Sequence, residues 1–393
     1  MSVDFDREID RTGTCSTKYD GRQATFGHPD VMPLWVADMD FAAPAAVTEA
    51  LVARAAHPVY GYTLFPDSLY EALINWLKLR HGWKVEREWI VLCPGVVPSL
   101  STVILALSGP DESVIVQPPV YYPFFSVIKK TGRKLLTSAL QLVEGSYRMD
   151  FADLSQQAVS ARMLLFCSPH NPVGRVWSRP ELERLLDIAR QHRLIIVSDE
   201  IHADLIYPGN KHHILASLAG SPESIITAVA PSKTFNIPGL NLSALIVPDP
   251  AYRAAIRDRL EMMHVSAANP FSVVAFEAAY RAGGEWLEAL MTYLADTREM
   301  VRQYLAEYLP EIRLILSQGT YLLWLDCRRL DMSDDEIKHF FIFEAGIGMN
   351  PGISFGKEGS GFMRMNIGAP RHRIRQALES IRSALERRRN SIS

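Results

Sequence analysis

The 393-residue chain has few cysteines, little net charge and no long hydrophobic run, and each of these absences argues against a class of protein. Its four cysteines lie far apart and form no CxxC pair, so neither a disulfide framework nor a zinc site is expected. The formal net charge of −3 gives no field that would attract DNA or an acidic membrane. No apolar run reaches the roughly 18 residues of a membrane-spanning helix.

The first residues, Met1 to Asp6, are acidic and lack the apolar segment of a signal peptide. Three of the cysteines, Cys93, Cys167 and Cys327, lie within or beside apolar runs, which is typical of buried, reduced thiols. These features predict a cytoplasmic protein that has no metal site and binds neither nucleic acid nor membrane.

The composition is that of an ordinary globular protein, with 48% apolar and 22% charged residues, and the length suggests two or three domains. Short apolar runs that read as strands alternate with helical patterns in the middle of the chain. The predicted strands are 90–93, 113–116, 163–168, 195–198, 225–230 and 243–247. This alternation predicts a mostly parallel sheet covered by helices on both faces.

The pattern changes beyond residue 284. One long helix is predicted over 284–308, followed by strands at 312–316 and 321–325 and by a helix that begins at the capping box Ser333–Glu336 and ends at Gly346. This part predicts a smaller α+β domain.

Lys233 lies just beyond the predicted strand 225–230, among Pro, Ser, Asn and Gly residues that favour a turn. Open α/β sheets bind ligands outside the carboxyl ends of their strands. A partly desolvated lysine at such a place can lose its proton near neutral pH, and its amine can then attack a carbonyl carbon. The ordinary alternative is a solvated surface lysine.

Two further strand ends carry polar side chains. Asn171 follows the strand 163–168, and Asp199 follows the strand 194–197, with His202 three residues later. Taken alone, Asn-Pro is a common turn and Asp-Glu a common helix cap. The ordered set of Asn171, Asp199 and Lys233 is much rarer by chance and predicts a single site.

These motifs belong to a set that extends over nearly the whole chain. The others are Trp35–Phe41, Tyr60–Tyr62, Pro119–Tyr121, Gly319–Asp326 and Arg364–Gly368. In this combination the sequence resembles the fold-type-I pyridoxal-phosphate (PLP) enzymes of the class I/II aminotransferase superfamily. Within them it resembles the MalY/PatB-type carbon–sulfur β-lyases, also called cystathionine β-lyases.

The resemblance implies an α/β fold of the PLP-dependent transferase type. A large PLP-binding domain would span residues 46–284. A smaller, discontinuous domain would combine the N-terminal arm, 1–45, with residues 285–393. The resemblance also implies a homodimer in which Tyr62 reaches the site of the neighbouring subunit.

The resemblance further implies roles around the cofactor ring. Lys233 would bind PLP and act as the general base, and Asp199 would keep the pyridine nitrogen protonated. Asn171 would donate to the phenolate oxygen of the ring. His202 would contact the same oxygen, or else serve as a packing histidine. Tyr121 would stack on the ring and relay a proton, although the adjacent Tyr122 leaves the register open.

The phosphate and the substrate would have their own groups. Val96 and Val97 at a predicted helix N-terminus, Ser232 beside the lysine, and Tyr62 from the partner would bind the phosphate. Arg364 would bind the substrate's α-carboxylate in a bidentate manner, with Asn171 and Tyr121 also facing the substrate. A surface ion pair is the ordinary alternative for the arginine.

One position departs from the aminotransferase pattern. Aminotransferases of this fold place a phosphate-binding arginine eight residues after the lysine, and here that residue is Asn241. The departure favours β-elimination, which would release a thiol (homocysteine from L-cystathionine), pyruvate and ammonia. A PLP-dependent aminotransferase and a regulatory binding protein on the same scaffold are the alternatives. The His212–His213 pair has no partner at ligand spacing and is expected in a solvated loop.

Overall fold

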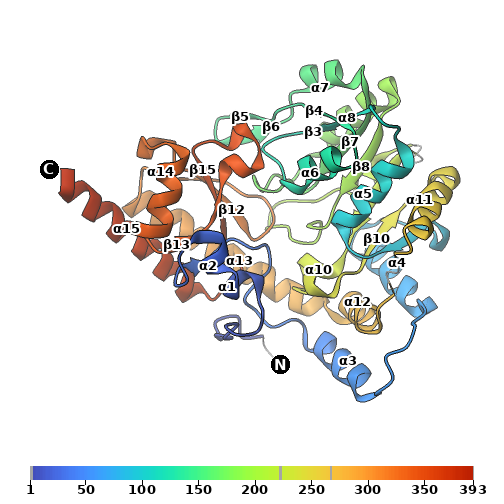
Figure 1. Cartoon of the computed structure of the whole chain (residues 1–393), viewed down its shortest axis with the longest axis horizontal. Helices are drawn as coiled ribbons and strands as arrows, with labels where there is room; N and C mark the ends of the chain where they lie inside the picture. Colours follow the sequence, from blue (N-terminus) through green and yellow to red (C-terminus); the bar gives the residue numbers. More distant parts are fainter. Residues whose placement is uncertain (1–2, 221–223, 266–267, 393) are drawn as a thin grey trace.

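The computed structural model describes residues 3–220, 224–265 and 268–392, and a seven-stranded sheet lies at its centre (Figure 1). The strand order is β2-β10-β9-β8-β7-β3-β4. The strands are β2 (Ile90–Cys93), β3 (Ser113–Val116), β4 (Lys134–Thr137), β7 (Ala161–Cys167), β8 (Ile195–Asp199), β9 (Ile225–Val229) and β10 (Ser243–Ile246). Strand β10 runs antiparallel to both of its neighbours, and the other pairs are parallel. The mostly parallel sheet is therefore confirmed.

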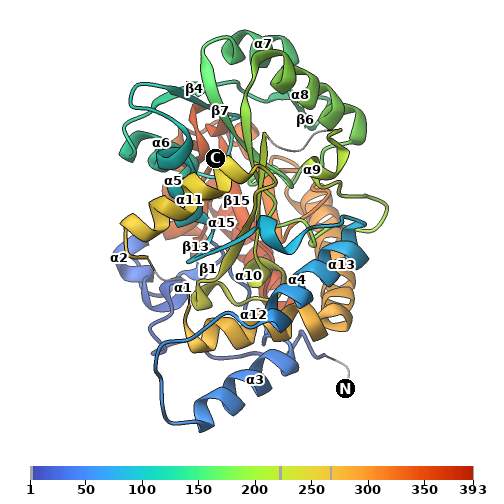
Figure 2. The ribbon, with the colours of Figure 1, turned by 90° about the vertical axis from the view of Figure 1, so that its right-hand side faces the viewer.

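Helices cover both faces of this sheet, because its central strands are apolar on both sides. Successive residues of β8 point to opposite faces: Ile195 and Val197 join one buried cluster and Ile196 joins the other. Helices α5 (Val96–Leu107), α6 (Pro123–Lys130) and α11 (Pro250–Met262) pack on the first face. Helices α4 (Asp67–His81), α8 (Arg179–His192), α9 (Leu215–Leu218) and α12 (Pro270–Ala282) pack on the other (Figure 2).

The C-terminal part of the chain forms a separate antiparallel sheet in the order β11-β12-β15-β14. Its strands are β11 (Arg313–Ile315), β12 (Leu322–Asp326), β14 (Asn350–Pro351) and β15 (Phe362–Asn366). The same part of the chain contains the helices α13 (Gly284–Tyr308), α14 (Asp334–His339) and α15 (Arg371–Ile392). The predicted helix 284–308 is confirmed. The helix from Ser333 was predicted to reach Gly346, but α14 gives way to a π-helical turn, Phe340–Glu344.

The N-terminal residues lie against this C-terminal part (Figure 1). Strand β1 (Met32–Pro33) pairs in parallel with β13 (Ile347–Gly348). The N-terminal arm also contains two short helices, α1 (Thr17–Asp20) and α2 (Arg22–Phe26). The remaining elements are α3 (Ala45–Ala56), the hairpin of β5 (Gln141–Val143) and β6 (Ser146–Arg148), α7 (Phe151–Ala158) and α10 (Pro231–Thr234).

All four cysteines are free, and Cys93, Cys167 and Cys327 are buried as predicted. Within the described ranges, no helix has the length and apolar character needed to cross a membrane.

Candidate active site

A cavity of about 300 Å³ opens at the carboxyl ends of β7, β8 and β9. Most of the residues singled out in the sequence line it: Val96, Val97, Tyr121, Asn171, Asp199, His202, Ser232 and Lys233. They come from five separate stretches of sequence. The sheet brings them together because the carboxyl ends of its parallel strands share one edge.

Lys233 lies in α10, which begins directly after β9. Its Nζ donates a hydrogen bond to the Ala37 carbonyl at 2.6 Å. Burial lowers the pKa of this amine to about 8, an effect that Arg364 adds to and that Asp38 and Asp199 oppose. A substantial fraction of the amine is therefore neutral, and nucleophilic, near physiological pH.

Asp199 ends β8 and is buried beside the lysine. Its Oδ1 accepts a hydrogen bond from the Ile201 backbone N–H at 3.2 Å. Burial raises the pKa of this carboxyl to about 7, because the hydrogen bond and the Lys233 charge only partly offset the loss of hydration. A ligand that brought a cationic N–H to this carboxylate would stabilise its charged form. The pyridinium nitrogen of PLP is such a group.

The start of α5 offers an anion site in the same cavity. Gly95 adopts a φ of +105°, which residues with a side chain rarely take, and turns the chain from β2 into the helix. No side chain of the described residues caps this helix, and Val96 and Val97 line the cavity, so their backbone N–H groups can bind an anion at the positive end of the helix dipole. Ser232 lines the same region. These groups fit a phosphate.

Tyr121 and Tyr122 point to different places. Tyr121 lines the cavity, and burial raises the pKa of its phenol well above the ordinary value. Tyr122 is half exposed and packs edge-on against Phe355, with ring centroids 6.0 Å apart. Of the two tyrosines, Tyr121 is thus the one that lines the cavity.

Arg364 is buried in β15, so the alternative of a surface ion pair is wrong. Its Nη1 donates to Asn171 Oδ1 at 3.0 Å. Its Nη2 donates to the Trp35 carbonyl at 2.9 Å and to Asn350 Oδ1 at 2.7 Å. Because Oδ1 of Asn171 already accepts a hydrogen bond, its Nδ2 is the group that remains to donate to a ligand.

His202 is buried at the edge of the cavity, and its ring meets that of Tyr321 edge-on at 6.0 Å. Burial lowers its pKa to about 3, with further lowering by the charges of Lys233 and Arg364. The imidazole is therefore neutral at physiological pH. Its Nδ1 has no hydrogen-bond partner among the described residues, so it remains available to a ligand.

Tyr62 lies outside the cavity of its own protomer. It is fully exposed in the connection between α3 and α4. The placement of Tyr62 in a partner's site stays a prediction.

Several functional contacts were missed in the sequence. Tyr321 donates to the Ala37 carbonyl at 2.9 Å, and Asn350 contacts Arg364 as described above. Tyr321 lies within the motif Gly319–Asp326, whereas nothing in the sequence indicated a role for Asn350. The expectation of a solvated His212 is wrong: this side chain is buried, and its Nε2 lies 2.7 Å from Glu200 Oε2. The described residues contain no cluster of three His, Cys, Asp or Glu side chains placed to bind a metal ion.

Comparison with known proteins agrees with this geometry. Residues 29–381 match the family "Aminotransferase class I and II". The chain is 41% identical to cystathionine beta-lyase PatB of Bacillus subtilis (strain 168), over 98% of this chain and all of PatB. It is 31% identical to protein MalY of Escherichia coli (strain K12), over 97% of this chain and 98% of MalY.

Solved structures give the same result. The crystal structure of cystalysin from Treponema denticola, which contains a pyridoxal 5'-phosphate cofactor, superposes with a TM-score of 0.94 at 36% identity, over 98% of this chain and 99% of that one. The PLP-bound C-S lyase from Staphylococcus hominis superposes with a TM-score of 0.91 at 31% identity, over 98% of each chain. The chain therefore belongs to the class I and II aminotransferase family and, within it, to the group that includes the cystathionine β-lyase PatB and MalY.

Proposed function

We propose that this protein is a PLP-dependent carbon–sulfur β-lyase. It takes L-cystathionine or a related cysteine S-conjugate and, with one water, yields a thiol (homocysteine from cystathionine), pyruvate and ammonia. The observation that carries the proposal is the cavity that joins the buried Lys233 amine to Asp199, Asn171 and an uncapped helix start. The names of PatB and of the C-S lyase from Staphylococcus hominis support it.

The residues present fit the cofactor. Lys233 would hold it through its amine, Asp199 would pair with the ring nitrogen, and Asn171 and His202 would be the groups for the phenolate oxygen. Tyr121 would cover the ring, while the backbone of Val96 and Val97 and the Ser232 hydroxyl would bind the phosphate. When bound, PLP supplies an electron sink for the bonds at the substrate's Cα.

The chain itself binds the substrate and moves the proton. Arg364 would bind the α-carboxylate with its planar guanidinium, whose Nε has no partner among the described residues, and would thereby orient the Cα–H bond toward Lys233. The Lys233 amine would remove the Cα proton as general base, since burial lowers its pKa to about 8. Departure of the thiolate from Cβ completes the elimination.

Asn241 supports elimination over amino transfer. It lines the cavity in a left-handed backbone conformation, with φ of +44°, and its Nδ2 is directed to the Gly239 carbonyl at 3.4 Å. No cation is therefore supplied to the phosphate from this position. The phosphate relies instead on the start of α5, on Ser232 and, in our proposal, on Tyr62 of a second protomer.

The test is turnover of L-cystathionine by the purified protein, with thiol and pyruvate measured together and Lys233→Ala as the control. We expect equal release of both products and its loss in the variant. Transfer of the amino group to an added 2-oxo acid without thiol release would instead establish an aminotransferase. Turnover that survived in Lys233→Ala would refute the assignment of the base.

We also propose a homodimer in which Tyr62 enters the partner's site. Lys233→Ala and Tyr62→Ala protomers, each nearly inactive alone, should be mixed, unfolded and refolded together. If the tyrosine acts in trans, half of the dimers are mixed and each contains one intact site, so about a quarter of the activity returns. No recovery would place Tyr62 in its own site or outside the mechanism.

Two further assignments belong to the proposal. The large domain comprises residues 46–284 and the small domain residues 1–45 and 285–393; the pairing of β1 with β13 supports the discontinuous unit. The location is the cytoplasm, and the four free cysteines support a reducing compartment.

A further inference from the structure

The segment Trp35–Phe41, here called the strap, contacts both of the cationic side chains of the site. The Ala37 carbonyl accepts from Lys233 Nζ at 2.6 Å, and the Trp35 carbonyl accepts from Arg364 Nη2 at 2.9 Å. The base and the carboxylate-binding arginine are therefore positioned by backbone atoms that are only two residues apart. The strap also carries two aspartates, Asp38 and Asp40.

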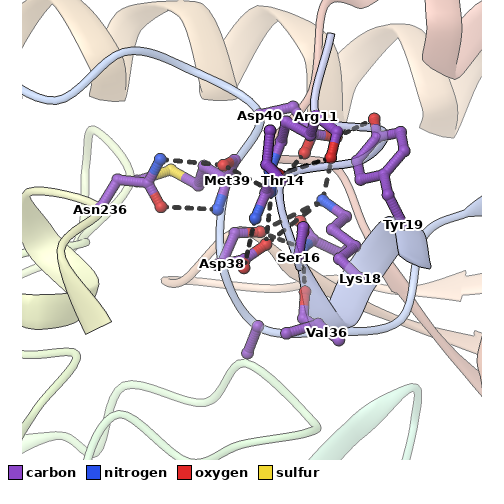
Figure 3. Close-up of polar contacts among 12 residues, drawn as sticks. Arg11, Thr14, Ser16, Lys18, Tyr19, Val36, Asp38, Met39, Asp40 and Asn236 are labelled. Atoms are coloured by element: carbon purple, nitrogen blue, oxygen red, sulfur yellow. Dashed lines mark hydrogen bonds and ion pairs between the residues drawn. The ribbon is translucent and has the colours of Figure 1, made fainter. Parts of the chain in front are cut away.

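Two asparagines bind the strap backbone. The Asn236 side chain, three residues after Lys233, accepts from the Met39 N–H at 2.8 Å and donates to the Met39 and Phe41 carbonyls. Asn366 Nδ2 donates to the carbonyls of Val36 and Asp38, at 2.6 and 2.7 Å. Figure 3 shows Asn236 on one side of the strap and a charged cluster on the other.

The charged cluster consists of Asp38 and Asp40 of the strap with Arg11 and Lys18 of the N-terminal arm. Arg11 binds Asp38 through both of its terminal nitrogens, each at 2.9 Å, and binds Asp40 Oδ1 at 2.7 Å. Lys18 is completely buried, and its Nζ lies 3.0 Å from Asp40 Oδ2 and 3.8 Å from Asp38 Oδ1 (Figure 3). Two cations thus neutralise two carboxylates next to the site.

We propose that Arg11 and Lys18 are positioning residues, which neutralise Asp38 and Asp40 and thereby hold the strap so that the Ala37 carbonyl, and not an uncompensated carboxylate charge, faces Lys233. The inference rests on the proposed function, because it assigns these residues a role through the catalytic lysine. Burial of a charged amine as complete as that of Lys18 costs free energy unless a carboxylate pairs with it. Asp38 and Asp40 provide this pairing.

The electrostatic surroundings of Lys233 give this arrangement a measurable consequence. The charges that act on its amine are Asp38 from the strap, Asp199 from β8 and Arg364 from β15, and the neutral His202 lies nearby. Asp38 raises the pKa of Lys233 even while it is paired. Removal of a cation from the cluster should therefore raise the pKa of Lys233 further. Removal of the Asp38 charge should abolish its contribution and lower that pKa.

The experiment is a pH titration of the visible absorbance of bound PLP, which reports protonation at Lys233 Nζ, in the purified holoenzyme. We expect Lys18→Met to raise the midpoint by about 0.5–1 pH unit and Asp38→Asn to lower it by a similar amount. Arg11→Gln should shift the midpoint in the same direction as Lys18→Met. The Arg11 variant tests the inference if replacement of the buried Lys18 prevents folding. Arg302→Gln, which removes an exposed ion pair with Glu299, is the matched control and should leave the midpoint unchanged.

Opposite shifts distinguish this role from simple anchoring of the arm. If the cluster only anchors the arm, Lys18→Met and Asp38→Asn will both lower the melting temperature, and both will move the titration midpoint in the same direction or leave it unchanged. Such a result would overturn the inference. A wild-type protein that binds no PLP would refute the proposed function and, with it, this inference. Bound PLP with unshifted midpoints would refute the inference alone.

Discussion

Replacement of Asp204 by alanine should destabilise the fold more than any exposed charge variant, by about 4 kcal/mol. Asp204 is buried between α4 and α10. Its Oδ1 accepts from Trp76 Nε1 at 3.0 Å and lies 2.8 Å from His81 Nε2, and its Oδ2 accepts from Thr234 Oγ1 at 2.9 Å. Because Thr234 adjoins Lys233 in α10, this carboxylate ties the helix that carries Lys233 to α4 in the outer layer.

The magnitude follows from the groups that alanine would leave without an acceptor. A buried donor that loses its partner costs about 1–3 kcal/mol, and three donors are affected here. Water that enters the space of the lost carboxylate would accept some of these hydrogen bonds and reduce the loss of stability. We therefore expect a loss of about 4 kcal/mol, which is similar to the usual cost of removing one partner of a buried charge pair. An unfolding entropy of about 2.1 cal/mol/K per residue gives roughly 0.8 kcal/mol/K for the whole chain, so the melting temperature should fall by about 5 °C.

Calorimetry of Asp204→Ala beside Asp187→Ala provides the measurement. Asp187 also pairs with a cation, Arg190 at 2.8 Å, but both side chains are about 70% exposed, and its loss should cost no more than about 0.5 kcal/mol. A fall for Asp204→Ala no larger than that of the control would refute the reasoning.

The pH dependence offers a second check on Asp204. Burial raises the pKa of this carboxyl, but hydrogen bonds from His81, Thr234 and Trp76 together with the His81 charge outweigh it, so the folded-state pKa is lowered. Its stabilising contribution is therefore complete above the unfolded-state pKa of about 3.9 and is lost as the pH falls through the lower folded-state value. The difference in stability between wild type and Asp204→Ala should narrow as the pH falls below about 4.

Three other outcomes follow from the site and the fold. Arg364→Lys should raise KM about tenfold or more with a smaller effect on kcat, because an ammonium cannot keep the fork that binds Asn171 and the carboxylate together; steady-state kinetics that showed a loss in kcat alone would contradict this. Capture of PLP by the apoprotein should accelerate as the pH rises through about 8, where Lys233 loses its proton; in stopped-flow absorbance, a transition near the ordinary lysine value of 10.5 would show that burial does not act as described. Gly174→Ala should destabilise the protein by about 2 kcal/mol or more in urea, because φ is +68° and a Cβ would lie 2.1 Å from Ser317 Oγ; unchanged stability would mean that this turn relaxes freely.

Local patterns determined the elements that carry the site. The apolar runs that became β7, β8 and β9 have strand length, and the alternating helices made a parallel sheet the expected arrangement. Lys233, Asp199 and Asn171 were recognisable because they stand at the ends of such runs. The helix 284–308 and the capping box at Ser333 could equally be predicted, since caps and periodicity depend on residues within a few positions of one another.

Contacts between distant residues were decided only by the tertiary structure. The Ala37 carbonyl and Lys233 are 196 positions apart, and nothing near either residue indicates the other. Asn350 contacts Arg364 because β14 pairs with β15, and His212 is buried because the loop that carries it folds over Glu200. A polar side chain has the same local signature whether it meets water or a buried partner, so its role emerges only when the chain has brought that partner to it.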